Sequence, residues 1–64
     1  MEQQDTSKII RQLRAELGLT QEQFAAKIGV TYSTVNRWEN SKANPSPLAM
    51  RTIRILQKKI SKSQ

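Results

Sequence analysis

The side chains that can take part in chemistry here are hydroxyls, amides and cations rather than catalytic nucleophiles or metal ligands. The 64 residues include no histidine and no cysteine, and the five acidic residues are scattered singly along the chain. Paired carboxylates and metal-ligand spacings are therefore absent, and acid–base or metal-assisted catalysis needs such patterns. We expect no enzyme activity, no metal, no cofactor and no small-molecule ligand.

The positive charge of the chain is unevenly distributed. The formal net charge is +6; residues 1–39 contain five basic and five acidic residues, whereas residues 40–64 contain six basic residues and no acid. Such an excess favours a polyanionic partner. A solubilising face on a terminal helix is the alternative explanation for any single one of these cations.

These side chains must be positioned by one small domain, because 64 residues leave no room for a second core. We expect a mobile tail over residues 1–6, a folded domain over residues 7–60 and a frayed end over residues 61–64. The cap of the first helix falls on Asp5, Thr6 or Ser7. Without cysteine, packing alone must hold the domain together.

Apolar residues recur at helical spacing in the first half of the chain and predict two helices. The first helix ends at Gly18, and the second opens at Thr20, where Gln23 completes a reciprocal capping box. The predicted inward residues of these two helices are Ile9, Ile10, Leu13 and Leu17, followed by Phe24, Ala25 and Ile28.

Two further helices are predicted in the second half. The third begins after a cap at Thr31, runs to about Glu39 and turns Val35 and Trp38 inward. Residues 40–47 form a loop because they contain two prolines, and Ser46 caps the fourth helix. The inward stripe of this last helix consists of Ala49, Ile53, Leu56 and Ile60.

The connection between the second and third helices makes specific demands on side chains. A short turn between crossing helices requires a small residue at Ala25, and Gly29 supplies a positive φ at the corner. Val30 fills the turn, while Val35 and Trp38 hold the third helix against the second. The opposite face of the third helix is left free to enter a major groove.

The run LTQEQFAAKIGVTYSTVNRWEN, residues 19–40, closely resembles the helix-turn-helix of the phage repressor and Cro-like, or XRE-type, transcriptional regulators. The likeness spans about residues 8–60. It implies an all-α, repressor-like bundle of four to five helices, in which residues 32–39 form a recognition helix in the major groove of duplex DNA. It also implies homodimers on two half-sites. We expect any such dimer to form through the fourth helix or its flanks, or only on DNA.

The resemblance gives DNA-binding roles to eight residues, namely Gln21, Thr31, Tyr32, Ser33, Thr34, Asn36, Arg37 and Lys42. Gln21 would bond a phosphate at a helix N-terminus, and the residues that begin the third helix would face phosphates or base edges. Arg37 is the preferred base contact, because its guanidinium can bond guanine O6 and N7 together, as Asn36 can bond adenine.

Simpler roles remain open for several of these residues. Gln21 and Ser33 can be helix caps only, Thr34 can face solvent, and Tyr32 can lie flat on a neighbouring helix. Trp38 is assigned to the core, because its spacing from Val35 turns it inward.

Two features beyond the recognition helix also follow from the resemblance. Arg14 and Glu39 match a pair that often ties the first helix to the end of the third, and the alternative is two solvated charges. Ser41 replaces a usual glycine, so we expect Asn40 or Asn44 to adopt the left-handed conformation instead.

The sequence also bears on three other classes of partner. A membrane surface could bind the basic, amphipathic fourth helix, but the apolar stripe of this helix is better explained as part of the protein core. RNA is disfavoured, because the narrow major groove of A-form RNA does not admit a helix. An antitoxin-like or adaptor protein with a protein partner remains open. No secretory signal or membrane span is evident, so we expect a cytoplasmic protein of bacterial or phage type that is nucleoid-associated when bound.

Overall fold

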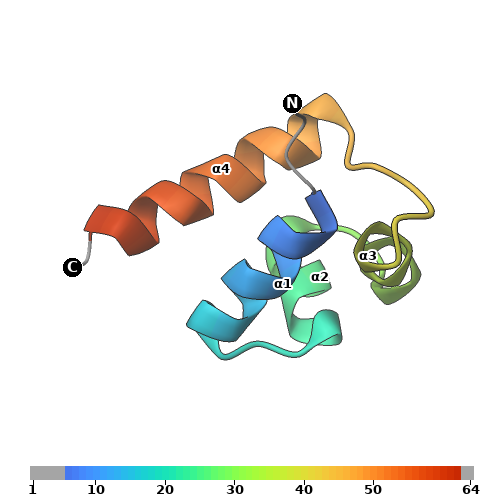
Figure 1. Ribbon diagram of the computed structural model, residues 1–64, viewed down its shortest axis with the longest axis horizontal. Coiled ribbons are helices and arrows are strands. Elements are labelled where there is room, and N and C mark those ends of the chain that lie inside the picture. Colours follow the sequence, from blue (N-terminus) through green and yellow to red (C-terminus); the bar gives the residue numbers. More distant parts are fainter. Residues whose placement is uncertain (1–5, 63–64) are drawn as a thin grey trace.

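The computed structural model describes residues 6–62, and all regular structure within them is helical. Figure 1 shows the shorter helices clustered together, with the longest helix lying across one side of the cluster. This is the all-α architecture expected from the sequence, and the described residues form four of the four to five expected helices. The helices are α1 (Thr6–Leu17), α2 (Gln21–Ile28), α3 (Tyr32–Glu39) and α4 (Pro47–Lys62).

The first and last described helices define the ends of the described chain. Helix α1 includes Thr6 and Ser7, whereas Asp5, the remaining cap candidate, and the rest of the predicted tail lie outside the described residues. Helix α4 continues to Lys62, two residues beyond the predicted domain end at 60. The last two residues, 63–64, also lie outside the described part.

Side-chain caps start α2, α3 and α4 at the residues that the sequence predicts. The Thr20 hydroxyl accepts from the Gln23 amide at 3.1 Å, and the Thr20 amide donates to Gln23 Oε1 at 2.9 Å, which completes the capping box. The Thr31 hydroxyl accepts from the Thr34 amide at 3.2 Å. The Ser46 hydroxyl accepts from the amide of residue 49, also at 3.2 Å.

The corner between α2 and α3 is tight because one carbonyl satisfies two amides. Gly29 ends α2 with φ 91°, and the amides of Gly29 and Val30 both donate to the Ala25 carbonyl, at 2.8 and 2.9 Å. Only residues 29–31 separate the two helices. The predicted left-handed corner at Gly29 is confirmed.

All four helices contribute to a single core. Phe24, Ile10, Ile53 and Val35 are the largest fully buried side chains, and Trp38 is only 4% exposed. Helix α3 packs on α1 and α2, and α4 packs on the same two helices. The remaining core residues are Leu13, Ala25, Ala49 and Leu56, with Ile9, Leu17, Ile28, Val30 and Ile60 partly buried against them.

The end of α3 corrects the expectation for the following loop. The residue with positive φ is Ser41 itself, at 60°, whereas Asn40 has φ −97° and Asn44 is not in the left-handed region. The Ser41 amide donates to the Trp38 carbonyl at 3.1 Å and the Lys42 amide to the Arg37 carbonyl at 2.9 Å. This pair of bonds is a Schellman motif, which fixes the left-handed position one residue after Asn40.

Glycine at position 41 should therefore stabilise the domain. We expect Ser41→Gly to raise the free energy of unfolding by about 1 kcal/mol, because it removes the cost of a left-handed L residue. Glycine also raises the entropy of the unfolded chain, but this opposing cost is smaller than the gain. Urea denaturation followed by circular dichroism measures the change. Ser41→Ala is the matched control, since it keeps the Cβ and should bring no gain; equal gains in both variants would contradict this explanation.

Candidate nucleic-acid interface

Helix α3 presents a polar face to solvent on the side opposite its core contacts. Val35 and Trp38 are buried, and at 100° per residue the opposite side carries Ser33 and Arg37, both exposed and one turn apart. Asn40, at the end of the helix, falls on the same side and is also exposed. These three side chains form the outward face of α3.

The other residues that the sequence assigns to DNA contact lie around the beginning and flanks of this face. Tyr32 is 49% exposed in the first turn, so it is not covered by a neighbouring helix. Thr34 is half-buried, and its hydroxyl lies 2.9 Å from that of Thr31. Asn36 is also half-buried, and its Oδ1 accepts from the Asn40 amide group at 3.3 Å.

Two predicted contact residues lie outside α3. Lys42 is exposed and its amide bonds the last turn of α3, so its side chain emerges beside the end of that helix. Gln21 is the first residue of α2 and is half-buried, and its Nε2 donates to Glu39 Oε1 at 3.0 Å. Gln21 therefore connects the start of α2 with the end of α3, while its second amide hydrogen can serve a phosphate.

A buried carboxylate, Glu39, joins α1, α2 and α3. The Glu39 side chain is 4% exposed and accepts two bonds from Arg14, Nε to Oε2 at 2.7 Å and Nη2 to Oε1 at 3.1 Å. Arg14 Nη1 also donates to the Leu19 carbonyl at 3.1 Å. The predicted pair of Arg14 and Glu39 is thus a bidentate bridge, the geometry in which arginine binds carboxylates most strongly.

Arg11 is a fourth member of this cluster that the sequence analysis missed. Its Nη2 donates to the backbone carbonyl of Glu39 at 2.9 Å, and its Nε lies 3.8 Å from Glu39 Oε1. The available signal was its position three residues before Arg14, which puts both on one face of α1. We call Arg11, Arg14, Gln21 and Glu39 the Glu39 cluster.

The Glu39 cluster holds its carboxylate ionised. Burial raises the pKa of Glu39, but the hydrogen bonds from Arg14 and Gln21 and the charges of Arg14 and Arg11 together outweigh it, so the pKa is below its ordinary value. The hydrogen bond to Glu39 raises the pKa of Arg14, against a smaller opposing effect of burial. The pair therefore stays charged at neutral pH.

The lowered pKa predicts an acid-sensitive stability. A carboxyl whose folded pKa lies below its unfolded pKa stabilises the fold fully above the ordinary value of 4.5, and this contribution is lost as pH falls through the folded pKa. We expect the stability difference between the parent chain and Glu39→Gln to be constant near neutrality and to shrink in acid. Urea midpoints measured across this range test the sign; a difference that grows in acid would contradict it.

Other kinds of site are not found in the described part of the chain. Residues 6–62 contain no group of three or more acidic, histidine or cysteine residues that could hold a metal ion. Within residues 6–60, every buried side-chain nitrogen and oxygen has a hydrogen-bond partner. No described helix is long and apolar enough to cross a membrane.

Two short helices joined by a tight turn, the second with a buried apolar side and an exposed polar side, define a helix-turn-helix domain. A family model described as "Helix-turn-helix" matches residues 10–54, which is most of the chain. The protein belongs to this family, the XRE-type, Cro/C1-like helix-turn-helix DNA-binding domains.

Two archaeal proteins are similar to this chain. One from Methanothermobacter thermautotrophicus is 47% identical over 38 residues, which cover 59% of this chain and 55% of the relative. One from Archaeoglobus fulgidus is 42% identical over 52 residues, or 80% of this chain and 74% of the relative. Both are described as uncharacterized HTH-type transcriptional regulators. The chain thus spans about half of the first relative's length. No solved structure matches the chain significantly.

Proposed function

We propose that this chain is a transcriptional regulator that binds duplex DNA sequence-specifically, with α3 in the major groove. The observation that carries the proposal is the outward face of α3, where Ser33 and Arg37 project from a helix whose other side is fixed by Val35 and Trp38. A major groove about 12 Å wide admits a helix with this arrangement. The family and the descriptions of both relatives support the same function.

The roles of the contact residues follow from where they lie. Arg37 contacts a base edge, because it is exposed near the middle of the outward face and has a forked donor. Ser33, Tyr32 and Thr31 lie at the N-terminus of α3, where hydroxyls and free amides bind phosphates. Lys42 adds a phosphate contact after the helix.

Gln21, Asn36 and Thr34 have more constrained roles, because each already makes a hydrogen bond. Gln21 orients α3 through Glu39 and keeps one amide hydrogen for phosphate. Asn36 contacts adenine if its weak 3.3 Å bond from Asn40 is exchanged for one to the base. Thr34 contributes mainly to the cap at Thr31.

Two copies bind adjacent half-sites and pair on the DNA. A single domain of this size makes few contacts, and doubling them raises affinity without any new contact chemistry. The longest dimension of the molecule is 32 Å, close to the roughly 34 Å between half-sites one helical turn apart. Neighbouring copies on one face of the duplex therefore come within reach of each other.

The protein acts by binding alone, within the cell compartment that holds the DNA. Its contacts to DNA are hydrogen bonds and charges, which need neither a metal nor a cofactor. The chain has no histidine or cysteine for catalysis. The protein is thus a regulator rather than an enzyme.

Titration of labelled random duplex at several salt concentrations, followed by sequence selection on the retained duplex, tests the function. Affinity should fall with salt with a slope of about −0.9 per phosphate neutralised, and selection should enrich a palindromic site. Anionic lipid vesicles serve as a control for binding to a negatively charged surface that is not DNA. Absence of duplex binding at low salt would refute the proposal, and enrichment of a single non-repeated half-site would refute the pairing of two copies.

A further inference from the structure

The outward face of α4 carries a second stripe that no other described element covers. Leu48, Arg51, Ile55 and Lys58 follow one another at spacings of three, four and three residues, which places them on one side of the helix. All four are exposed, Leu48 by 73% and Ile55 by 49%, whereas Ile53 on the opposite side is fully buried. We call these four residues the α4 stripe.

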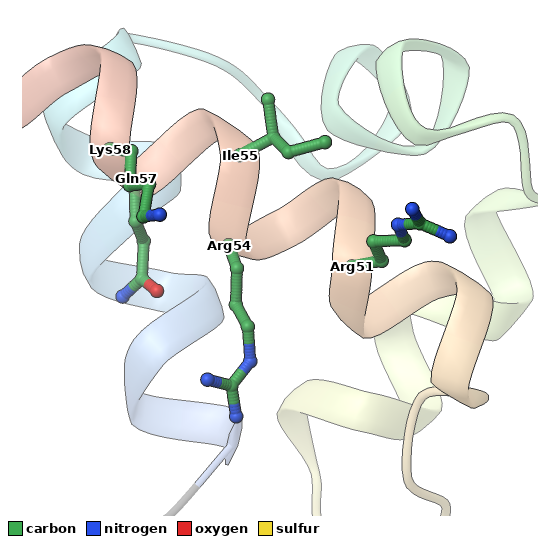
Figure 2. Close-up of a pocket in the computed structure, with 5 residues that line it drawn as sticks. All are labelled: Arg51, Arg54, Ile55, Gln57 and Lys58. Atoms are coloured by element: carbon green, nitrogen blue, oxygen red, sulfur yellow. The ribbon is translucent and has the colours of Figure 1, made fainter.

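A surface hollow lies along this part of α4. It is lined by Arg51, Arg54, Ile55, Gln57 and Lys58. Figure 2 shows that these side chains all extend from α4, so the hollow belongs to one helix rather than to a cleft between two. Arg51, Arg54 and Lys58 are exposed and make no ion pair within residues 6–62. Three cations and an accessible isoleucine of one helix therefore line the hollow.

The alternation of apolar and basic side chains indicates a protein partner rather than a nucleic acid. A phosphate backbone matches Arg51 and Lys58 but offers no apolar surface to Leu48 and Ile55. The α4 stripe also diverges from the outward face of α3, because both helices direct their buried side chains at the same core. Figure 1 shows α3 and α4 on different sides of the α1 and α2 pair. A duplex on α3 thus leaves the α4 stripe accessible.

Charge argues against a second copy of this chain as the occupant. An antiparallel pair of α4 helices centred between Arg54 and Ile55 would place Arg51 of one copy against Lys58 of the other. Like charges at such positions destabilise a helix pair. No acidic residue occurs between residues 40 and 64 to relieve this repulsion. A partner that binds the α4 stripe must therefore provide acidic side chains.

We propose that the α4 stripe binds an acidic amphipathic helix of another protein. Glutamate or aspartate side chains of that helix pair with Arg51 and Lys58, and its apolar side chains pack on Leu48 and Ile55. Recognition of a helix by apolar anchors three and four residues apart is an established physical mode. The contact is independent of DNA binding, so the chain can hold a duplex and this partner together.

The interaction should be weak and dependent on salt. Helix α4 has 16 residues and is about 24 Å long, so one helix face buries less than the roughly 1,200 Å² typical of stable complexes. Exposed charge pairs mainly accelerate association and are screened by salt. Micromolar affinity at low ionic strength, decreasing as salt is added, is the expected behaviour.

The test uses the full chain and a labelled synthetic helical peptide of about 16 residues, with leucine every third or fourth position and glutamate between. Fluorescence anisotropy measures its binding to the parent and to two charge-matched variants, Arg51→Glu and Lys8→Glu. Lys8 is exposed on α1, outside the α4 stripe. Arg51→Glu should weaken binding about tenfold, and Lys8→Glu by less than about twofold. Ile55→Ser should also weaken binding, and circular dichroism verifies that each variant folds.

Parallel titrations with random duplex, anionic phosphatidylserine vesicles and the chain itself distinguish other occupants. Peptide binding that is sensitive to Arg51→Glu, with duplex affinity retained, supports the proposal. It is overturned if Arg51→Glu weakens duplex binding in the absence of peptide binding, if vesicles bind instead of the peptide, or if sedimentation shows a dimer that Arg51→Glu dissociates. Peptide binding without duplex binding would leave this inference intact and remove only the proposed function.

Discussion

Replacing Glu39 by glutamine should lower the free energy of unfolding by about 3 kcal/mol. The carboxylate is 4% exposed and accepts from Arg14 through both oxygens and from Gln21. Glutamine keeps one acceptor oxygen but places an NH₂ group against the donors of Arg14, which leaves a partly buried guanidinium without its counter-charge. Because a chain of 64 residues has a total stability of only roughly 3–10 kcal/mol, the change removes a large share of it.

Urea denaturation at neutral pH measures this loss, and Glu16→Gln provides the matched control. Glu16 is exposed near the end of α1 and makes no ion pair within residues 6–60, so its replacement should change stability by less than about 0.5 kcal/mol. Equal effects of the two substitutions would show that the burial and hydrogen bonds of Glu39 do not determine its contribution to the free energy of unfolding.

The Glu39 cluster also sets the direction of α3, and a second variant separates this role from stability. Buried ion pairs can often be replaced by apolar residues with little loss of stability. We therefore expect Arg14→Met combined with Glu39→Leu to fold with much of the parental stability but to discriminate poorly between selected and random duplex. If this double variant discriminates between selected and random duplex as well as the parent chain does, packing alone orients α3.

Most of the helix-turn-helix could be predicted from local sequence signals, because each acts over a few residues. The capping box of Thr20 and Gln23 and the left-handed Gly29 depend on contacts within one turn of helix. The inward pair of Val35 and Trp38 depends on helical periodicity alone. Such features do not require knowledge of the rest of the fold.

The features that could not be predicted from the sequence depend on contacts between distant residues, or on which of several neighbouring residues adopts the left-handed conformation. Arg11 and Glu39 are 28 residues apart, and nothing local indicates that the Arg11 guanidinium reaches a carbonyl at the end of α3. The intrinsic tolerance of asparagine for the left-handed conformation predicts Asn40 or Asn44 at this position, and that prediction is wrong. The Schellman bonds at the end of α3 instead determine the position, and it falls on Ser41.

Substitution of Arg37 by alanine should weaken binding to the selected DNA site by about 1–3 kcal/mol and affect random duplex much less. Arg37 is exposed on the outward face of α3, one turn from Ser33, and makes no ion pair within the described chain. Its forked donor is free to bond one guanine at two atoms. Because the side chain is exposed, Arg37→Ala should leave stability within about 0.5 kcal/mol of the parent.

Arg37→Lys separates base recognition from charge, since lysine keeps the positive charge but cannot form the bidentate bond. If Arg37 contacts a base, Arg37→Lys should retain the affinity for random duplex and its salt dependence, yet lose most of the discrimination that Arg37→Ala loses. Competition of selected against random duplex, measured for both variants, gives this comparison. Uniform weakening of both duplexes by Arg37→Ala, with recovery in Arg37→Lys, would make Arg37 a phosphate contact and assign base recognition to its neighbours on the outward face.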